Sequence, residues 1–282
     1  MRAVVPHKTA TPLTMPPGDD LEQRLGASPL LVLLDIDGTL APIAPTPEGA
    51  VVPPATLEAV ARLVGLSGVH VALVTGRAVA DGRRMVDVPG TWVIGNHGIE
   101  RLDPSGGLHV DAGVRRYESD LARAAADLAS RLAGVSGAIV EDKRWTLSVH
   151  YRLVDPALRP RIQSEAEDVA RRYSLRCIIG KQVLELRPPV DVNKGTAALA
   201  LADSFGIVSA SSDARTGAIL CIGDDRTDED AFRLLRARRP DSVTIHVGAG
   251  GLVSGEQTIA ELLLPDTDAV RGLLEWLAAV RQ

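Results

Sequence analysis

Short apolar runs recur along the chain, and each is long enough to form one β-strand. They occupy residues Leu30–Leu34, Val69–Val74, Trp92–Ile94, Ala218–Ile222 and Val243–Val247. Continuous apolar runs of this length are typical of parallel strands that helices cover on both faces. We therefore predict that these runs form a buried parallel sheet, in which ordered structure begins near Pro29.

Segments with helical character lie between the runs and after the last one. They are Pro54–Val64, Lys194–Phe205, Asp228–Arg236 and Asp266–Val280. Alternating strands and helices predict an α/β fold with an open, doubly wound parallel sheet. The active site of such a sheet lies at the carboxyl ends of its strands.

The middle of the chain has a different pattern. Two amphipathic helices are predicted at Val114–Leu132 and Pro156–Tyr173, and two hairpins at Ala138–His150 and Leu175–Leu186, the second turning at Gly180-Lys181. This order predicts an α+β domain inserted into the α/β core. We expect a disordered leader at residues 1–28, a catalytic core at 29–107 and 188–282, and the inserted domain at 108–187.

Composition narrows the class of protein. Hydrophobic residues make up 45% of the chain and charged residues 24%, as in ordinary soluble globular proteins. The net charge of -5 argues against a nucleic-acid partner. No apolar stretch is long enough to span a membrane, and the first residues lack a signal core. We expect a cytoplasmic enzyme, whose oligomeric state the sequence does not define.

Candidate chemistry begins directly after the first predicted strand, in the segment Asp35–Thr39 (DIDGT). Asp35 at a strand end can present its carboxylate as a nucleophile. Asp37, two residues on, can act as an acid and then as a base. The structural alternative is a strand that ends in an Asp-Gly turn.

Two further segments carry groups that suit a phosphate. Thr75-Gly76-Arg77 follows the second predicted strand, where a hydroxyl and a backbone N–H can bind an anion. The alternative is that Thr75 is a helix cap and Gly76 a turn residue. Lys194 opens a predicted helix, where a cation opposes the helix dipole unless an anion binds beside it. Its alternative is a solvated lysine.

The last segment, Gly223–Asp230 (GDDRTDED), is rich in acids. Thr227 can cap the following helix, and acids in the first helical turn suit its dipole. That explanation leaves Asp224 and Asp225 at a strand end. Carboxylates that converge there with Asp35 repel one another without a cation, and oxygen-only ligands favour Mg²⁺.

In this order, the four segments resemble the haloacid dehalogenase-like phosphatase superfamily over the whole chain after the leader. The resemblance implies Asp35 as nucleophile and Asp37 as general acid and base. It also implies Mg²⁺ held by Asp35, the backbone carbonyl of Asp37, Asp224 and nearby Asp228. Thr75, Gly76 and Lys194 would bind the transferring phosphoryl group.

Segments around and within the insert resemble trehalose-6-phosphate phosphatases. They are Gly95–Glu100, Glu141–Lys143, Ser148–Arg152 and Glu185–Pro188. Taken singly, these are ordinary turns, hairpin tips and exposed strand residues. The resemblance implies that Glu141, Lys143 and Glu185 hydrogen-bond sugar hydroxyls. It also places four residues on the core side of the substrate: Arg77, Asn96, His97 and Arg187.

Three other functions stay open. The nearest is a phosphatase of another sugar phosphate, such as sucrose 6-phosphate or a glycosyl-phosphoglycerate, because it shares all four core segments. A phosphomutase is disfavoured, since the stretch between Leu40 and Thr75 is too short for an inserted cap. A catalytically dead sensor or regulator is disfavoured because Asp35, Asp37, Lys194 and Asp224 are all present.

Overall fold

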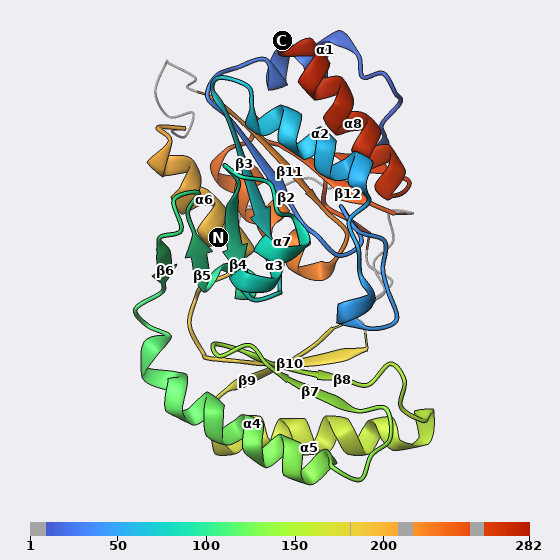
Figure 1. The fold of residues 1–282 in the computed structure, drawn as a ribbon, viewed down its shortest axis with the longest axis vertical. Helices are drawn as coiled ribbons and strands as arrows, with labels where there is room; N and C mark the ends of the chain where they lie inside the picture. The colour runs from blue at the N-terminus through green and yellow to red at the C-terminus, as the bar shows by residue number, and fades with distance from the viewer. Residues whose placement is uncertain (1–9, 181, 208–216, 249–256) are drawn as a thin grey trace, which may run out of the picture. The chain divides into compact units, whose positions relative to one another are not determined.

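The computed structural model describes residues 10–180, 182–207, 217–248 and 257–282. The chain divides into two compact units (Figure 1). Unit 1 comprises Met1–Leu108 and Asn193–Gln282, and unit 2 comprises His109–Val192. Among the described residues, no helix has both the length and the apolar character needed to cross a membrane.

Within the described residues, nine strands form one sheet in the order β1-β13-β12-β11-β2-β3-β4-β5-β6. The pairs from β1 to β4 are parallel, and β5 joins antiparallel to β4. The strands are β1 (Thr11–Pro12), β2 (Leu30–Leu34), β3 (Val69–Val74), β4 (Trp92–Gly95), β5 (Glu100–Leu102), β6 (Leu108–Val110), β11 (Ala218–Gly223), β12 (Val243–Val247) and β13 (Leu262–Leu264).

Helices cover both faces of this sheet (Figure 1). Helices α1, α2, α3 and α8 contribute to the core on one face, and α6 and α7 to the core on the other. Their bounds are α1 (Asp19–Leu25), α2 (Pro54–Val64), α3 (Val79–Met85), α6 (Lys194–Ser204), α7 (Arg226–Arg238) and α8 (Thr267–Val280). Short 3-10 helices form at η1 (Pro47–Gly49) and η2 (Asn96–Gly98).

The central strand β2 shows why a continuous apolar run forms here. All five residues of Leu30–Leu34 are fully buried. Leu30, Val32 and Leu34 belong to the core on one face, and Leu31 and Leu33 to the core on the other. Successive side chains of a strand point to opposite faces, so a strand covered on both sides needs apolar residues throughout. The predicted doubly wound α/β core is confirmed.

Unit 2 is a four-stranded antiparallel sheet in the order β7-β8-β10-β9, with two helices packed on one face (Figure 1). The bounds are β7 (Ile139–Asp142), β8 (Leu147–His150), β9 (Arg176–Ile179), β10 (Val183–Arg187), α4 (Glu118–Leu132) and α5 (Arg159–Arg172), with 3-10 turns η3 (Arg115–Tyr117) and η4 (Pro156–Leu158). This is the predicted helix-hairpin-helix-hairpin order. Lys181, in the predicted turn of the second hairpin, lies outside the described residues.

The expectation of a disordered leader is wrong for residues 10–28; residues 1–9 lie outside the described part of the chain. Strand β1 pairs with β13, and α1 buries Leu21 and Leu25 against the sheet. Arg24 also binds Glu261 through two hydrogen bonds of 2.6 and 2.7 Å. Two leucines four residues apart suffice to anchor one short helix, although proline, threonine and charge dominate the surrounding composition.

Candidate active site

Three neighbouring strands, β11, β2 and β3, end at one edge of the unit 1 sheet. Asp35 follows β2, Thr75 follows β3, and Asp224 follows β11. Asp35 is fixed by its backbone N–H, which donates to the carbonyl of Ile222 at 3.0 Å. Because parallel strands carry their carboxyl ends to the same edge, residues 40 to 189 positions apart in sequence meet there.

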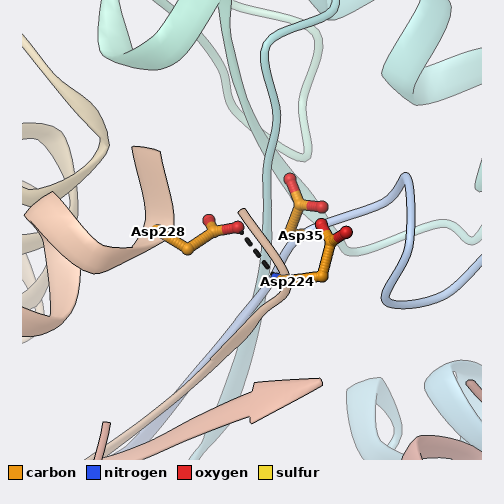
Figure 2. Close-up of side chains that lie close together, drawn as sticks. All are labelled: Asp35, Asp224 and Asp228. Atoms are coloured by element: carbon orange, nitrogen blue, oxygen red, sulfur yellow. Dashed lines mark hydrogen bonds between the residues drawn. The ribbon is translucent and has the colours of Figure 1, made fainter. Parts of the chain in front are cut away.

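An acid cluster of Asp35, Asp224 and Asp228 forms at this edge (Figure 2). One carboxylate oxygen from each lies within 4.8 Å of those of the other two. Asp228, in the first turn of α7, accepts hydrogen bonds from the backbone N–H groups of Asp224 and Asp225, both at 3.1 Å. These bonds tie the strand end to the helix start.

Lys194 lies against this cluster, and its side chain is 1% exposed. Its ammonium donates to Asp35 at 2.7 Å and to Asp228 at 2.8 Å. Asn193 caps helix α6 directly before Lys194, because its side chain accepts from the N–H of Thr196. The alternative of a solvated lysine is therefore excluded. Lys194 is a buried cation aimed at the predicted nucleophile.

Negative charge exceeds positive charge in this buried space. Burial and, to a lesser degree, the charges of Asp224 and Asp225 raise the pKa of Asp35 to about 8, against the opposing effect of Lys194. Burial also raises the pKa of Asp228 well above its ordinary value. For Lys194, burial alone lowers the pKa, but the surrounding carboxylates outweigh that effect and raise it well above the ordinary value. One lysine does not balance these acids.

Two glycines allow the acids to approach. Gly38 has φ +86°, and a Cβ built on it would lie 2.2 Å from a carboxylate oxygen of Asp224. A Cβ on Gly223 would lie 2.1 Å from the carboxyl carbon of Asp228. Any larger residue at either position would displace one of the acids.

These observations fit a bound divalent cation. The donors are carboxylate oxygens, which hard cations prefer, and the glycine contacts leave the acids close to one another. A cation would also offset the repulsion from Asp224 and Asp225, which adds to the effect of burial in raising the pKa of Asp35. The carboxylate of Asp37 lies outside this cluster, which leaves its backbone carbonyl as the ligand that the family resemblance implies.

Asp37 and Arg77 form an ion pair. Arg77 Nε donates to Asp37 Oδ2, and Arg77 Nη2 donates to Asp37 Oδ1, both at 2.7 Å. The same Nη2 donates to the carbonyl of Pro47 at 2.8 Å. The family resemblance implies that Arg77 contacts the substrate; its pairing with Asp37 was not predicted.

The other predicted residues of unit 1 lie after β3 and β4. Thr75 is 1% exposed, and its hydroxyl accepts a hydrogen bond of 3.1 Å from the backbone N–H of Arg77. A hydroxyl that accepts one bond still has a hydrogen to donate. Asn96 and His97 are buried with φ of 48° and 55°. A Cβ on Gly76 would lie 2.4 Å from the His97 ring, so this ring packs on the Thr75–Arg77 turn.

Unit 2 carries a polar cluster on one face of its sheet. Glu141 and Glu185 flank Ser148 in one cross-strand row. Lys143 Nζ lies 3.7 Å from Glu141 and 3.9 Å from Glu185, and Arg187 Nε donates to Glu185 at 2.8 Å. The three residues predicted to bind the sugar from the insert, Glu141, Lys143 and Glu185, are thus brought together. Arg187, which was expected on the core side of the substrate, instead lies on β10 of unit 2 and joins this cluster.

Asp225, expected at the strand end beside Asp35, lies 4.0 Å from Lys194 and also caps α7, where Thr227 was the expected cap. Sequence reasoning missed two residues of the unit 2 cluster, His150 and Ser148. His150 Nε2 lies 2.8 Å from Glu141 Oε2. The hydroxyl of Ser148 is buried and has no hydrogen-bond partner among the described residues. Strand alternation places Ser148 and His150 on the face of Glu141, a signal that the sequence did contain.

Solved structures share this architecture. A crystal structure of a "trehalose-6-phosphate phosphatase related protein" matches with a TM-score of 0.74 and 26% sequence identity, over 88% of this chain and 97% of that chain. The fold and the acids at its strand ends define the class of this protein, which has the haloacid dehalogenase-like fold.

Sequence relatives narrow the class. A trehalose-phosphatase family model matches residues 33–267. The trehalose-phosphate phosphatase of Mycobacterium leprae (strain TN) is 34% identical over 237 residues, which cover 83% of this chain and 51% of that protein. Uncharacterized glycosyl hydrolase MT2062 of Mycobacterium tuberculosis is 38% identical over 205 residues, 73% of this chain and 15% of that protein. The chain belongs to the trehalose-phosphatase family, as its motifs predicted. It spans about half or less of the length of these two relatives.

Proposed function

We propose that this chain hydrolyses the phosphate monoester of a hydroxyl-rich sugar, trehalose 6-phosphate, through a phosphoryl group carried on Asp35. One observation carries the proposal: Asp35 is buried at the end of β2 against both Lys194 and two further acids. A carboxylate held beside a buried cation and a candidate metal site suits attack on phosphorus. The family match supports the substrate.

In the first step, an oxygen of Asp35 forms a bond to phosphorus while the bond from phosphorus to the sugar oxygen breaks. Asp37 gives its proton to the departing oxygen, which leaves as a sugar hydroxyl. In the second step, water adds to phosphorus, its proton passes to Asp37, and the bond to Asp35 breaks. Inorganic phosphate leaves, and both aspartates return to their starting state.

We propose Mg²⁺ as the cation, held by Asp35, the backbone carbonyl of Asp37, Asp224 and Asp228. When bound, it supplies positive charge to the phosphoryl oxygens. Thr75 and the backbone N–H of Gly76 would bind those oxygens on one side. Lys194 would bind them on another, since its ammonium already reaches Asp35.

Sugar recognition is assigned to both units. Glu141, Lys143, Glu185 and Arg187 offer carboxylate and cationic groups that suit a ligand with many hydroxyls, and they form one cluster on the unit 2 sheet. Asn96 and His97 hold left-handed backbone conformations, which cost about 1–3 kcal/mol each and cluster at functional sites. Sites built on hydrogen bonds reject analogues that lack a hydroxyl.

A panel of sugar phosphates tests the substrate. Phosphate release is measured with trehalose 6-phosphate, sucrose 6-phosphate, a glucosyl-phosphoglycerate and glucose 6-phosphate, each with Mg²⁺, with other divalent cations and with a chelator. We expect the highest kcat/KM for trehalose 6-phosphate with Mg²⁺. Preference for another member of the panel would reject trehalose 6-phosphate as the substrate but would still support phosphatase activity. Hydrolysis of none would favour the regulatory alternative.

Replacement of the nucleophile tests the mechanism. Asp35→Asn is expected to lower kcat by at least about 10³-fold, because a carboxamide does not form the phosphoryl ester. The exposed Asp87 provides a matched control, since Asp87→Asn should keep full activity. Near-normal turnover by a folded Asp35→Asn variant would reject covalent catalysis at this position.

A cytoplasmic location stays a prediction, which cell fractionation would test.

A further inference from the structure

The Arg77 guanidinium is engaged with Asp37 and with the chain beyond it. Two of its nitrogens hold the two carboxylate oxygens of Asp37 at 2.7 Å, and one of them also binds the carbonyl of Pro47 at 2.8 Å. The Arg77 side chain is 13% exposed and that of Asp37 35%. Arg77 therefore connects the turn after β2 to η1.

The backbone on both sides of this pair is fixed. The N–H of Arg77 donates to the Thr75 hydroxyl at 3.1 Å, and the carbonyl of Arg77 accepts from the N–H of Asn96 at 2.7 Å. Beside Asp37, the N–H of Gly38 donates to the carbonyl of Ala41 at 2.7 Å. These bonds hold the backbone at Arg77 and next to Asp37, and the bidentate contact then sets the geometry of the two side chains.

A bidentate pair defines the plane as well as the position of a carboxyl group. It uses one lone pair on each oxygen, and each oxygen keeps another for a substrate or water. Proton transfer requires hydrogen-bond reach, and a displacement of about 1 Å can cost about 10²-fold in rate. A proton-transferring Asp37 would therefore benefit from the Arg77 fork.

We propose that Arg77 is a positioning residue, which fixes the carboxyl group of Asp37 for proton transfer to the departing oxygen and does not itself bind the sugar. This inference rests on the proposed function, in which Asp37 is the acid and base. It assigns Arg77 to the step in which the bond to the sugar oxygen breaks, whereas the family resemblance implies contact with the substrate.

The test uses aryl phosphates, which lack sugar hydroxyls. The series runs from p-nitrophenyl phosphate, whose phenolate leaves unaided, to phenyl phosphate, whose oxygen needs a proton. The quantity measured is kcat/KM, because it reports the steps up to phosphoryl transfer and excludes hydrolysis of the Asp35 ester. The variants are Arg77→Ala, Arg77→Lys, Asp37→Asn and the Arg77→Ala/Asp37→Asn double variant. Arg84→Ala is the matched control, since Arg84 is an exposed arginine of α3 that binds Asp81.

We expect Arg77→Ala to lower kcat/KM about 10²-fold for phenyl phosphate and far less for p-nitrophenyl phosphate. The variant's kcat/KM should therefore depend more steeply on the acidity of the leaving group than that of wild type. The loss should be absent from the Asp37→Asn background. Added guanidinium should restore part of the activity of Arg77→Ala but none of that of Asp37→Asn. Arg77→Lys, which keeps the charge without the fork, should show an intermediate loss, and Arg84→Ala none.

Equal losses across the aryl series, or losses that add to those of Asp37→Asn, would show that Arg77 binds the phosphoryl group and would overturn the inference. A loss confined to sugar phosphates would place Arg77 at the sugar and overturn it as well. Either result leaves the proposed phosphatase intact. If the wild-type protein hydrolyses no monoester, both proposals fail. Circular dichroism of each variant separates these outcomes from unfolding.

Discussion

At the scale of single residues, the site is defined by an imbalance of charge. Lys194 faces Asp35 and Asp228 directly, and Asp225 lies at 4.0 Å. Taking charges out of water is costly unless opposite charges accompany them. Two buried acids, Asp35 and Asp228, with partly exposed acids beside them and one lysine, are therefore an arrangement that a divalent cation and a phosphate together would complete.

The first prediction concerns the stability of metal-free protein. Asp35 has an ordinary pKa of 3.8, which the fold raises to about 8, mainly by burial. The folded state thus binds this proton more tightly than the unfolded state. The contribution to stability is fully present below about pH 4 and is lost as the pH rises through about 8. Urea titrations in chelator should show a larger loss of unfolding free energy over this range in wild type than in Asp35→Asn.

Addition of a divalent cation provides the complementary measurement. Metal ligands must be deprotonated, so cation and proton compete for Asp35. We expect Mg²⁺ to raise the melting temperature of wild type more at about pH 8 than at about pH 5. The increase should be smaller in Asp35→Asn than in wild type. Equal stabilisation at both values, or an undiminished effect in the variant, would contradict a cation at this cluster.

At the scale of elements, α1 is held by few contacts. It is therefore a good place to test whether the chain before β2 is ordered and packed on the core. Leu25 is 1% exposed in the unit 1 core. Leu25→Ala should lower the free energy of unfolding by about 2–4 kcal/mol, measured by denaturant titration. Gln23→Ala, at an exposed position of the same helix, should change it by less than about 0.5 kcal/mol. Equal effects would mean that α1 adds nothing to the core.

Elements with strong patterns were predictable, and those with weak patterns were not. The runs Leu30–Leu34 and Val69–Val74 match β2 and β3 because burial on both faces demands apolar residues throughout. Helix α3 and strands β5 and β6 were not predicted, because their short, mixed sequences depend on tertiary neighbours.

The candidate site, too, was predictable only in part. Asp35, Asp224 and Lys194 could be placed together, because strand ends and helix starts fix backbone positions. The pairs Asp37–Arg77 and Glu141–His150 could not, because they depend on side-chain rotamers and on which neighbour each charge meets in space. Strand alternation indicates that Glu141 and His150 share a face of the sheet, but it does not indicate which charges pair.

At the scale of the whole molecule, the two units have separate cores. Leu128 of α4 is fully buried in the unit 2 core, which shares no residue with the cores of unit 1. We expect Leu128→Ala to destabilise unit 2 by about 2–4 kcal/mol. Hydrogen exchange should then accelerate within residues 109–192 and stay unchanged in β2 and β3.

The exposed Ser130 of the same helix supplies the control, since Ser130→Ala should leave exchange in both units as in wild type. If protection in β2 fell as much as in α4, the molecule would unfold as one cooperative body, and separate cores would not mean separate stability.

One contact within unit 1 bears on how the insert is attached. At Gly98 the outgoing chain passes so close to Asn193, where unit 1 resumes, that a Cβ on Gly98 would lie 2.5 Å from the Asn193 carbonyl oxygen. The segment before β5 and the start of α6 are thus held together within unit 1. Under the proposed function, an insertion, deletion or exchange confined to residues 109–192 would leave this contact and the acids at the strand ends in place, so the substrate could change while the chemistry is kept.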